Sequence, residues 1–397
     1  MTRIAVDTGD DVAPWLGTVE EVATALARTA VERDQRGGTA TAERQLLRES
    51  GLLALSVPTG QGGLGADWQA VLGVVRRFAR VDSSVAHLFA FHHLLLATTR
   101  LFGHDGQWQP WLKESVQRRW FWGNALNPLD KGALASPSSN GGYTFSGRKS
   151  FCSGAADSDM LVVSAFENNS RLLIGVVPTA RKGITVLNDW DNMGQRQTDS
   201  GTVILDRLSV APADLLTDPG PLSTPFACLR PMLAQLILAN IYLGLGEGAL
   251  AEARSFTLQS ARPWIASPAA SASEDLYVLG HYGDFWLALE GARALADKAS
   301  AAFDDAWQRG TALTERQRGK VAVAVAAAKV ATTRAGLEVA NRMFEVTGAR
   351  ATTAALRLDR FWRNLRVHTL HDPLDYKVRE LGDWALNERL PVPSFYS

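Results

Sequence analysis

Residues 142–154 read Gly-Tyr-Thr-Phe-Ser-Gly-Arg-Lys-Ser-Phe-Cys-Ser-Gly, and this stretch decides how the whole chain is interpreted. It contains a short apolar run and then a turn rich in glycine and serine, which is typical of a strand followed by a turn. Similar runs, bounded by Gly, Asn, Asp and Pro, recur between about Phe121 and Pro212. We therefore expect a small central β-domain with strands at Tyr143–Ser146, Met160–Phe166, Leu172–Val177, Ile184–Leu187 and Thr202–Leu205.

Helical periodicity flanks this region on both sides. From about Thr18 to Ser115, and again after Pro225, apolar residues recur at spacings of three and four. Thr18 with Glu21, and Thr314 with Gln317, have the spacing of a capping box. The sequence predicts an α+β fold with domains at 1–118, 119–224 and 225–397. The late helices are expected at Pro231–Ser260, Asp275–Arg309, Thr314–Val346 and Thr353–Arg366.

The composition disfavours several classes of partner. The 41 basic and 41 acidic side chains cancel, so no global field favours nucleic acid or a membrane surface. Two cysteines cannot form a disulfide scaffold, and the acidic N-terminus lacks the apolar core of a signal peptide. Met232–Leu250 is the most apolar long stretch, but Gln235, Asn240 and Glu247 interrupt it, so we interpret it as a buried helix. We expect a cytoplasmic protein.

Four segments resemble the acyl-CoA dehydrogenase superfamily. They are Gly142–Gly154, Met193–Ser200 followed by Val210-Ala-Pro212, Arg262-Pro-Trp264, and Phe344–Gly348 followed by Arg357-Leu-Asp-Arg360. Their order matches the helix, strand, helix layout. The resemblance implies that family's fold, with an N-terminal helical domain, a barrel-like β-domain and a C-terminal four-helix bundle. It also implies a flavin cofactor and a homotetramer. Arg262 would bind the flavin phosphate, and that flavin would belong to a neighbouring subunit if the site is shared between subunits.

The segment His368-Thr-Leu-His371-Asp372-Pro373 is similar to the dibenzothiophene monooxygenase-like branch of this superfamily. So are His87–His93, Gly123-Asn124-Ala125 and Asp189-Trp190. The branch implies that a separate reductase supplies reduced flavin, FADH2 or FMNH2. The reduced flavin reacts with O2 to form a C4a-hydroperoxide, which oxygenates an aromatic or heteroaromatic molecule, indole-like or thiophene-like.

Two alternatives remain open. An acyl-CoA dehydrogenase or oxidase with FAD needs a carboxylate base, and Asp372 occupies that position but is one methylene shorter than the family's glutamate. A non-catalytic protein that retains the fold is the second alternative.

The resemblance also implies a set of site residues. Catalytic roles fall to Ser153, Asn124, His87 and His371. The flavin would be contacted by Asn124, Phe151, Cys152, Ser153, Trp190, Ser200 and Arg262. The substrate pocket would be lined by Phe91, His92, Trp190 and His368. Phe91 stands where the family usually has tyrosine, so a phenolic donor near the substrate is lost.

Two other patterns in the sequence are weaker. His87 and His92 are five residues apart and do not share a helix face, so we expect no metal site. Gly60-Gln-Gly62-Gly-Leu-Gly65 matches a dinucleotide-binding motif literally, but helical patterns follow it rather than a parallel β-α-β unit. We interpret this glycine cluster as a loop before a helix.

Overall fold

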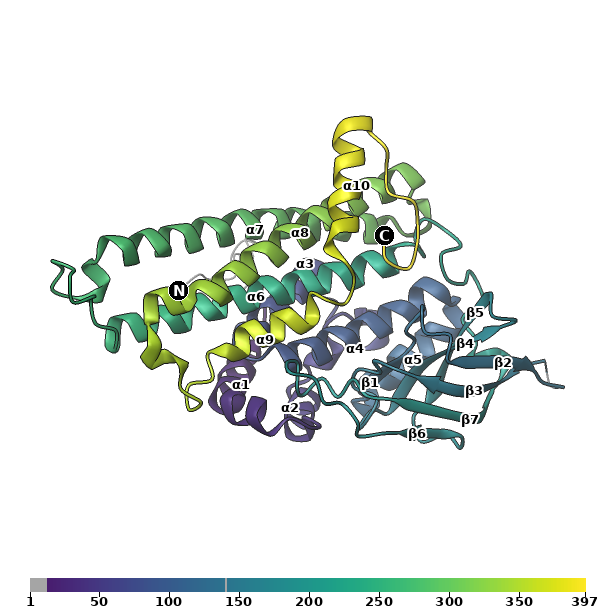
Figure 1. Ribbon diagram of the computed structural model, residues 1–397. Coiled ribbons are helices and arrows are strands. Elements are labelled where there is room, and N and C mark those ends of the chain that lie inside the picture. Colours follow the sequence, from purple (N-terminus) through teal and green to yellow (C-terminus); the bar gives the residue numbers. More distant parts are fainter. Residues whose placement is uncertain (1–12, 140) are drawn as a thin grey trace.

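The computed structural model describes residues 13–139 and 141–397, and helices, strands and helices follow one another along the chain (Figure 1). The acidic segment 1–12, which argues against a signal peptide, lies outside the described residues. The N-terminal helices are α1 (Leu16–Arg36), α2 (Thr41–Ser50), α3 (Trp68–Ala79), α4 (Ser83–Phe102) and α5 (Asp105–Arg118).

Two aspartates begin the helices that matter most for the site. Asp67 accepts a hydrogen bond from the Ala70 backbone N–H at the start of α3, and Asp82 accepts one from Val85 at the start of α4. Helix α4 is buried on all sides because it packs between α3, α6 and the β-domain, and within it only Arg100 is partly exposed. The glycine cluster 60–65 forms a turn and loop before α3, as expected.

The strands form one sheet in the order β1-β4-β2-β3-β7-β6, with β5 paired to the other side of β4. Gly147 allows the bulge between β3 and β7, because its φ is +137° and a Cβ there would lie 2.1 Å from the Gly132 carbonyl oxygen. The strands are β1 (Trp122–Ala125), β2 (Ala133–Pro137), β3 (Tyr143–Lys149), β4 (Met160–Glu167), β5 (Arg171–Pro178), β6 (Ile184–Val186) and β7 (Val203–Val210).

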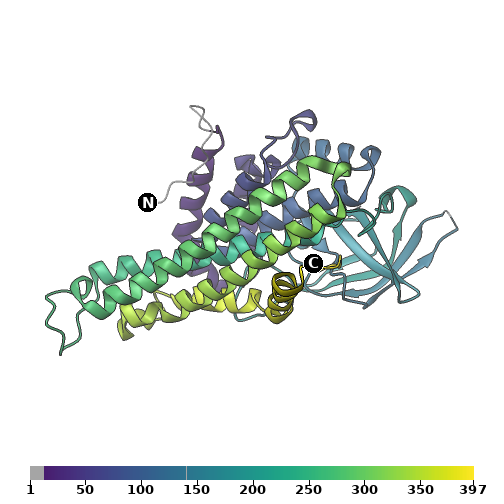
Figure 2. The same cartoon turned by 90° about the horizontal axis from the view of Figure 1, so that it is seen from above.

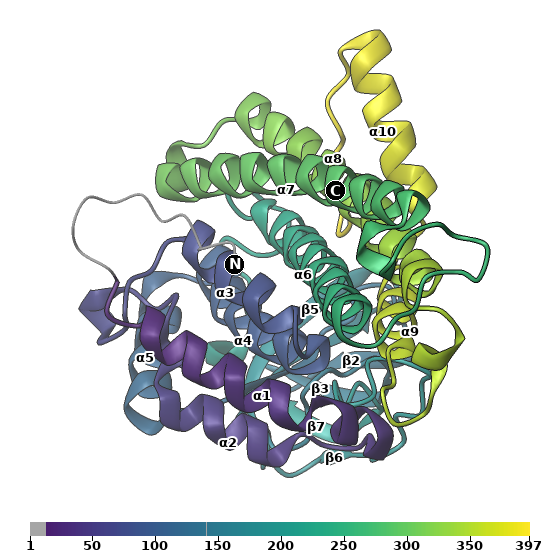
Figure 3. The same cartoon turned by 90° about the vertical axis from the view of Figure 1, so that its left-hand side faces the viewer.

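The C-terminal region is built on three long helices that run side by side (Figure 2). Seen along the bundle, α7 and α8 lie on one side of α6 and α4 lies on the other, while α3 packs against both α6 and α7 (Figure 3). The expected C-terminal helical domain is confirmed. The helix expected at Thr353–Arg366 begins later, at Asp359, and a further short helix follows the turn at Pro373. The helices are α6 (Leu229–Gln259), α7 (Leu276–Arg309), α8 (Glu315–Thr347), α9 (Asp359–His368) and α10 (Leu374–Asn387).

Helix α6 is the centre of the molecule. Among the described residues it alone is long and apolar enough to cross a membrane, yet 89% of its most apolar window is buried inside the protein. Its Leu, Ile and Ala side chains join a core shared by the N-terminal and C-terminal helices, whereas the β-domain has a separate small core. The two helical regions are therefore one packed body, with the β-domain attached at one end (Figure 1).

Candidate active site

A chain of hydrogen bonds runs from α4 into the loop before β7. The Nε2 atom of His87 lies 2.9 Å from the Oγ of Ser153, which lies 2.8 Å from the Oγ of Ser200. Ser200 is 2.8 Å from the Oγ1 of Thr198, and Thr198 donates to the Gln195 carbonyl at 3.0 Å. All four side chains are buried, so each hydrogen in the chain has a restricted choice of partner.

Counting donors gives this chain a direction. A carbonyl oxygen only accepts, so the single hydroxyl hydrogen of Thr198 goes to Gln195, and Ser200 must donate to Thr198. Ser153 must then donate to Ser200, and its oxygen accepts from His87. We infer that His87 carries its proton on Nε2 and presents an unprotonated Nδ1, which is buried without a partner. Burial, with a smaller contribution from His371, lowers the pKa of His87 to about 3 and keeps the ring neutral.

Three of the predicted side chains gather around the His87 ring. Phe91 stacks on it with ring centroids 4.0 Å apart, and His368 lies 4.9 Å away on the other side. The His368 ring is buried, and its Nδ1 has no hydrogen-bond partner. His371 is less buried, with a side chain 42% exposed, and in its protonated form it would lower the pKa of both His87 and His368. The structure therefore brings His87, Phe91, His368 and His371 together.

His371 is held by a buried ionic network. Its Nδ1 lies 3.0 Å from the Oδ1 of Asp372, and the same oxygen accepts from Lys329 at 3.0 Å and from Gln235 at 3.3 Å. Burial would raise the pKa of Asp372, but the hydrogen bond from His371 and the charge of Lys329 outweigh it and lower that pKa. Asp372 thus stays ionised and occupied, so it orients His371 and is not free to act as the base of a dehydrogenase.

Two further predicted residues, Asn124 and Phe151, adjoin Ser153. The Asn124 backbone N–H donates to the Ser153 carbonyl at 3.0 Å, and its side-chain Oδ1 accepts from Leu126. Its Nδ2 has no hydrogen-bond partner within the described part of the chain and can donate to a ligand. Phe151 is 60% exposed and has a φ of +57°, an unusual conformation for an aromatic residue. Its ring lies 6.1 Å from Trp190, edge to face.

Three predicted residues, His92, Cys152 and Arg262, do not join this group of side chains. His92, which was expected in the substrate pocket, is fully buried on another face of α4. Its Nε2 bonds the Leu53 carbonyl and its Nδ1 accepts from the Trp122 N–H, so neither ring nitrogen is free. The Cys152 thiol points into the β-domain core, where burial raises its pKa to about 12, and its N–H is bonded to Gly201. Neither group of Cys152 is available to a cofactor.

Arg262 is far from Ser153 within one chain. It is exposed in the loop after α6, and this loop and the β-domain are at opposite ends of the molecule (Figure 1). Helix α6 alone has 31 residues, which corresponds to about 46 Å. Arg262 can therefore contribute to a flavin site only in another subunit.

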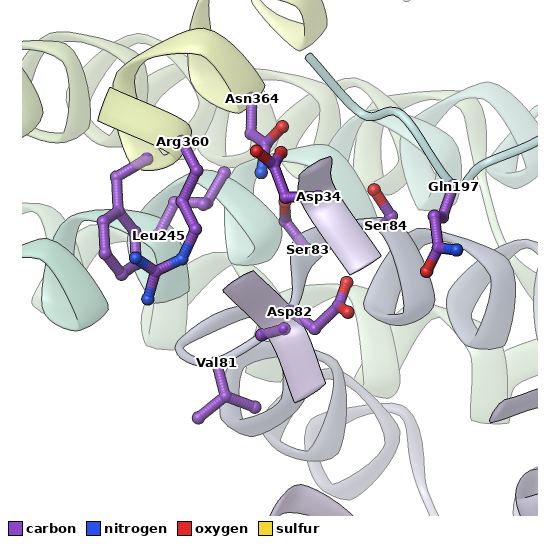
Figure 4. A pocket seen from close by; sticks show the side chains of 11 residues that line it. Asp34, Val81, Asp82, Ser83, Ser84, Gln197, Leu245, Arg360 and Asn364 are labelled. Carbon is purple, nitrogen blue, oxygen red and sulfur yellow. The ribbon is translucent and has the colours of Figure 1, made fainter. Parts of the chain in front are cut away.

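A small cavity lies next to Gln197, and the residues that line it serve mainly to hold the surrounding elements together (Figure 4). Asp34 and Asn364 lie on one side of it, and Ser84 and Gln197 on the other. Asn364 accepts from the Gln195 backbone N–H at 2.6 Å, and the Gln195 side chain donates to Ser83 at 3.0 Å. These bonds hold the loop that carries Thr198 and Ser200 against α4 and α9.

Sequence reasoning missed several of these residues. Thr198, Gln235 and Lys329 were not predicted, although Lys329 is the single charge between Val321 and Thr333 in a run rich in Ala and Val. A lone charge in an apolar helix indicates a buried partner, so this signal was available. Thr198 gave no such signal, because a threonine in a turn is ordinary. Among the described residues, no group of three or more His, Cys, Asp or Glu side chains is placed to hold a metal ion.

Comparison with known proteins identifies the family. Residues 17–118, 130–208 and 236–376 match the N-terminal, middle and C-terminal domains of acyl-CoA dehydrogenase. The probable FMNH2-dependent monooxygenase SfnC of Pseudomonas putida is 56% identical over 97% of this chain and 98% of its own. A dibenzothiophene monooxygenase of Rhodococcus erythropolis is 41% identical over 93% of this chain and 92% of its own.

Solved structures agree in shape over the same length. Methanesulfinate monooxygenase MsuC from Pseudomonas fluorescens superposes with a TM-score of 0.96, with 57% identity over 98% of this chain and all of that one. TdsC from Paenibacillus, solved with FMN and indole, has a TM-score of 0.92 and 39% identity over 96% of this chain and 99% of its own. The choice between FAD and FMN that the sequence left open is thereby decided for FMN. The chain belongs to the acyl-CoA dehydrogenase family and is an FMNH2-dependent monooxygenase.

Proposed function

We propose that this enzyme oxygenates a small organic sulfur compound at the site between Ser153, His87 and His371. The observation that carries the proposal is the directed hydroxyl chain from Gln195 to His87, which lies beside the free Asn124 amide and the exposed Phe151 ring. The names of the relatives support sulfur as the reacting element, in dibenzothiophene and in methanesulfinate. A heteroaromatic substrate of the indole or thiophene type, expected from the sequence, is one member of the range to be tested.

The geometry of each residue suggests a separate role in binding flavin, accepting hydrogen bonds or exchanging protons. Reduced FMN, which a reductase must supply, provides the electrons that activate O2 when it is bound. Asn124 Nδ2 would donate to the flavin edge, and Ser153, whose hydrogen is committed to Ser200, would present its oxygen as an acceptor. His87 would accept at Nδ1. His371, oriented by Asp372, is the partly exposed imidazole that can exchange a proton with solvent. Phe91, stacked on the His87 ring, would exclude water from that face of the imidazole.

The quaternary and cellular setting is part of the same proposal. We propose a homotetramer in which Arg262 of one subunit meets the FMN phosphate of another, because Arg262 and Ser153 lie at opposite ends of one subunit. A cytoplasmic location is supported by the two cysteines, which are both free and buried.

The experiment measures how much consumed O2 reaches the substrate. Ser153→Ala and Asn124→Ala are each assayed with reduced FMN, O2 and an organic sulfur substrate, and product is compared with hydrogen peroxide. Each loses one polar contact to the flavin, so we expect the fraction coupled to product to fall by about 10-fold or more. Ser158→Ala is the matched control, since Ser158 lies in the same turn but bonds Ala155 and Thr179. Unchanged coupling in both site variants would show that the flavin is placed wrongly.

A further inference from the structure

A buried arginine at the start of α6 has no carboxylate to balance it. Arg230 is only 6% exposed, and its one hydrogen bond is a long contact of 3.4 Å from Nε to the Thr98 hydroxyl. Within residues 13–139 and 141–397, no acidic side chain lies within ion-pair distance of it, and its two terminal nitrogens have no protein partner. A buried guanidinium is expensive to desolvate, so its lack of a partner requires an explanation.

The surroundings make this position still less favourable for a cation. Arg230 is the second residue of a 31-residue helix, where the macrodipole places about half a positive charge. A second arginine, Arg318 on α8, lies 2% exposed beside Cys228, the residue that precedes α6. Arg318 donates to the Pro391 carbonyl, and its Nε and Nη2 are buried without partners. Two arginines and a helix N-terminus thus concentrate positive charge. The charge of Glu380 acts on Arg318, but neither arginine forms an ion pair within the described residues.

Two other buried arginines, Arg360 and Arg44, are paired with carboxylates. Arg360 is also 6% exposed and is also the second residue of its helix, α9. Glu252 lies 3.3 Å from it, and the carbonyls of Leu356 and Arg357 accept its other hydrogens. Arg44 is paired with Asp199 at 3.3 Å. Arg230 and its neighbour Arg318 therefore differ from Arg360 and Arg44, because neither of them forms an ion pair within the described residues.

Arg230 lies on the side of α4 that carries the proposed oxygen-transfer site. Its partner Thr98 follows His87 and Phe91 along α4 at helical spacing, so these three side chains share one face. Arg230 also interacts electrostatically with the Tyr396 phenol, whose ring is 5.8 Å from the His371 ring. Tyr396 thus links the arginine to His371, whereas Thr98 lies three turns of α4, about 16 Å, from His87.

We propose that Arg230 binds the anionic head group of the substrate, a sulfinate, sulfonate or carboxylate, and so selects small organic anions over neutral heterocycles. The inference rests on the proposed function, which places the reacting atom near His87 and His371. A planar guanidinium with two free nitrogens can donate two parallel hydrogen bonds to such an oxyanion. The anion would supply the charge that the protein lacks at the start of α6.

The test measures binding of methanesulfonate, an unreactive probe, to the protein by calorimetry, with neutral dimethyl sulfone as the comparison ligand. We expect Arg230→Met to weaken methanesulfonate binding about 10- to 100-fold and to leave dimethyl sulfone binding unchanged. Arg230→Lys keeps the charge but loses the two-pronged geometry, so it should fall between. Arg360→Met is the matched control; it should lower thermal stability and keep wild-type affinity for methanesulfonate.

Several outcomes would overturn the proposal. One is equal methanesulfonate affinity in wild type and Arg230→Met; another is a wild-type protein that binds no alkanesulfonate of one to four carbons. Inorganic phosphate that binds as tightly as methanesulfonate would indicate an unselective anion site. Without ligand, Arg230→Met should melt at or above the wild-type temperature, whereas a large decrease would assign Arg230 a structural role. Failure of the flavin placement would instead appear in the coupling of Ser153→Ala, with sulfonate binding still dependent on Arg230.

Discussion

At the scale of the residue, the chemistry of this site depends on where single hydrogens lie. Ser153 has one hydroxyl hydrogen, and the chain through Ser200 and Thr198 directs it away from His87. His87 therefore donates from Nε2 and keeps a lone pair on Nδ1. This arrangement exists before any ligand binds, so it can be measured on the protein alone.

Removing a link in the chain should change the His87 tautomer. In Ser200→Ala, the Ser153 hydroxyl is free to turn and donate to His87 Nε2, so the ring proton should move to Nδ1. We expect the histidine 15N chemical shifts to report the Nε2–H form in wild type and the Nδ1–H form in the variant. The lost hydrogen bond should also lower the free energy of unfolding by about 1 kcal/mol. Ser158→Ala should leave the His87 signals unchanged, and the same Nε2–H signals in Ser200→Ala would contradict the assigned direction.

At the scale of the element, α8 and the turn between α9 and α10 are tied by one ion pair. Lys329 is 1% exposed in the middle of α8 and meets Asp372 in that turn at 3.0 Å. Because the pair is enclosed, its two charges depend on each other more than those of an exposed pair do. The turn also carries His371, so the same contact that holds the elements together orients a side chain of the site.

Breaking this pair from one side should cost more than removing it altogether. Lys329→Met leaves Asp372 buried without its cation, and we expect the free energy of unfolding to fall by about 3 kcal/mol. Lys329→Met with Asp372→Asn removes both charges and should be more stable than Lys329→Met alone, as measured by urea denaturation. Arg309→Met, in an exposed pair with Asp305 on α7, should change stability by less than about 0.5 kcal/mol. Strict additivity of the two substitutions would mean that the charges are not coupled.

At the scale of the whole molecule, α7 exposes an apolar surface that a single chain leaves uncovered. Trp286 is 60% exposed and Leu287 67% exposed, and more large apolar side chains continue toward the loop that carries Arg262. Exposed apolar patches of this kind usually mark an interface. Burial of this surface against another subunit would bring Arg262 into contact with that subunit.

Mixed oligomers can show whether two chains build one flavin site. Ser153→Ala and Arg262→Ala subunits are co-refolded in equal amounts, and coupled oxygenation is compared with each variant alone. If each site takes Ser153 from one chain and Arg262 from another, random mixing restores about a quarter of the sites. Recovery no greater than the average of the two variants would place both residues in one chain's site. Trp286→Glu should lower the molar mass in light scattering, and a wild-type mass for that variant would exclude this face as the interface.

Helix starts show how far local sequence reasoning extends. The Thr314 and Gln317 capping box was predicted and is present at the start of α8. The same spacing at Thr18 and Glu21 is not used, because α1 begins earlier, at Leu16. A capping box satisfies backbone donors only if the helix actually starts there, and packing decides that start.

The sequence by itself determined the layout of this protein, because periodicity and turn residues act locally. The order of helices, strands and helices and most strand positions were predictable from it, whereas the grouping of Ser153, His87 and His371 was expected only from the resemblance to a known branch. Only the tertiary structure decided the direction of the hydroxyl chain, the burial of His92 on another face of α4, and the isolation of Arg230. Each of these depends on which groups from distant segments meet in space, and a hydrogen bond or an unbalanced charge exists only once they have met.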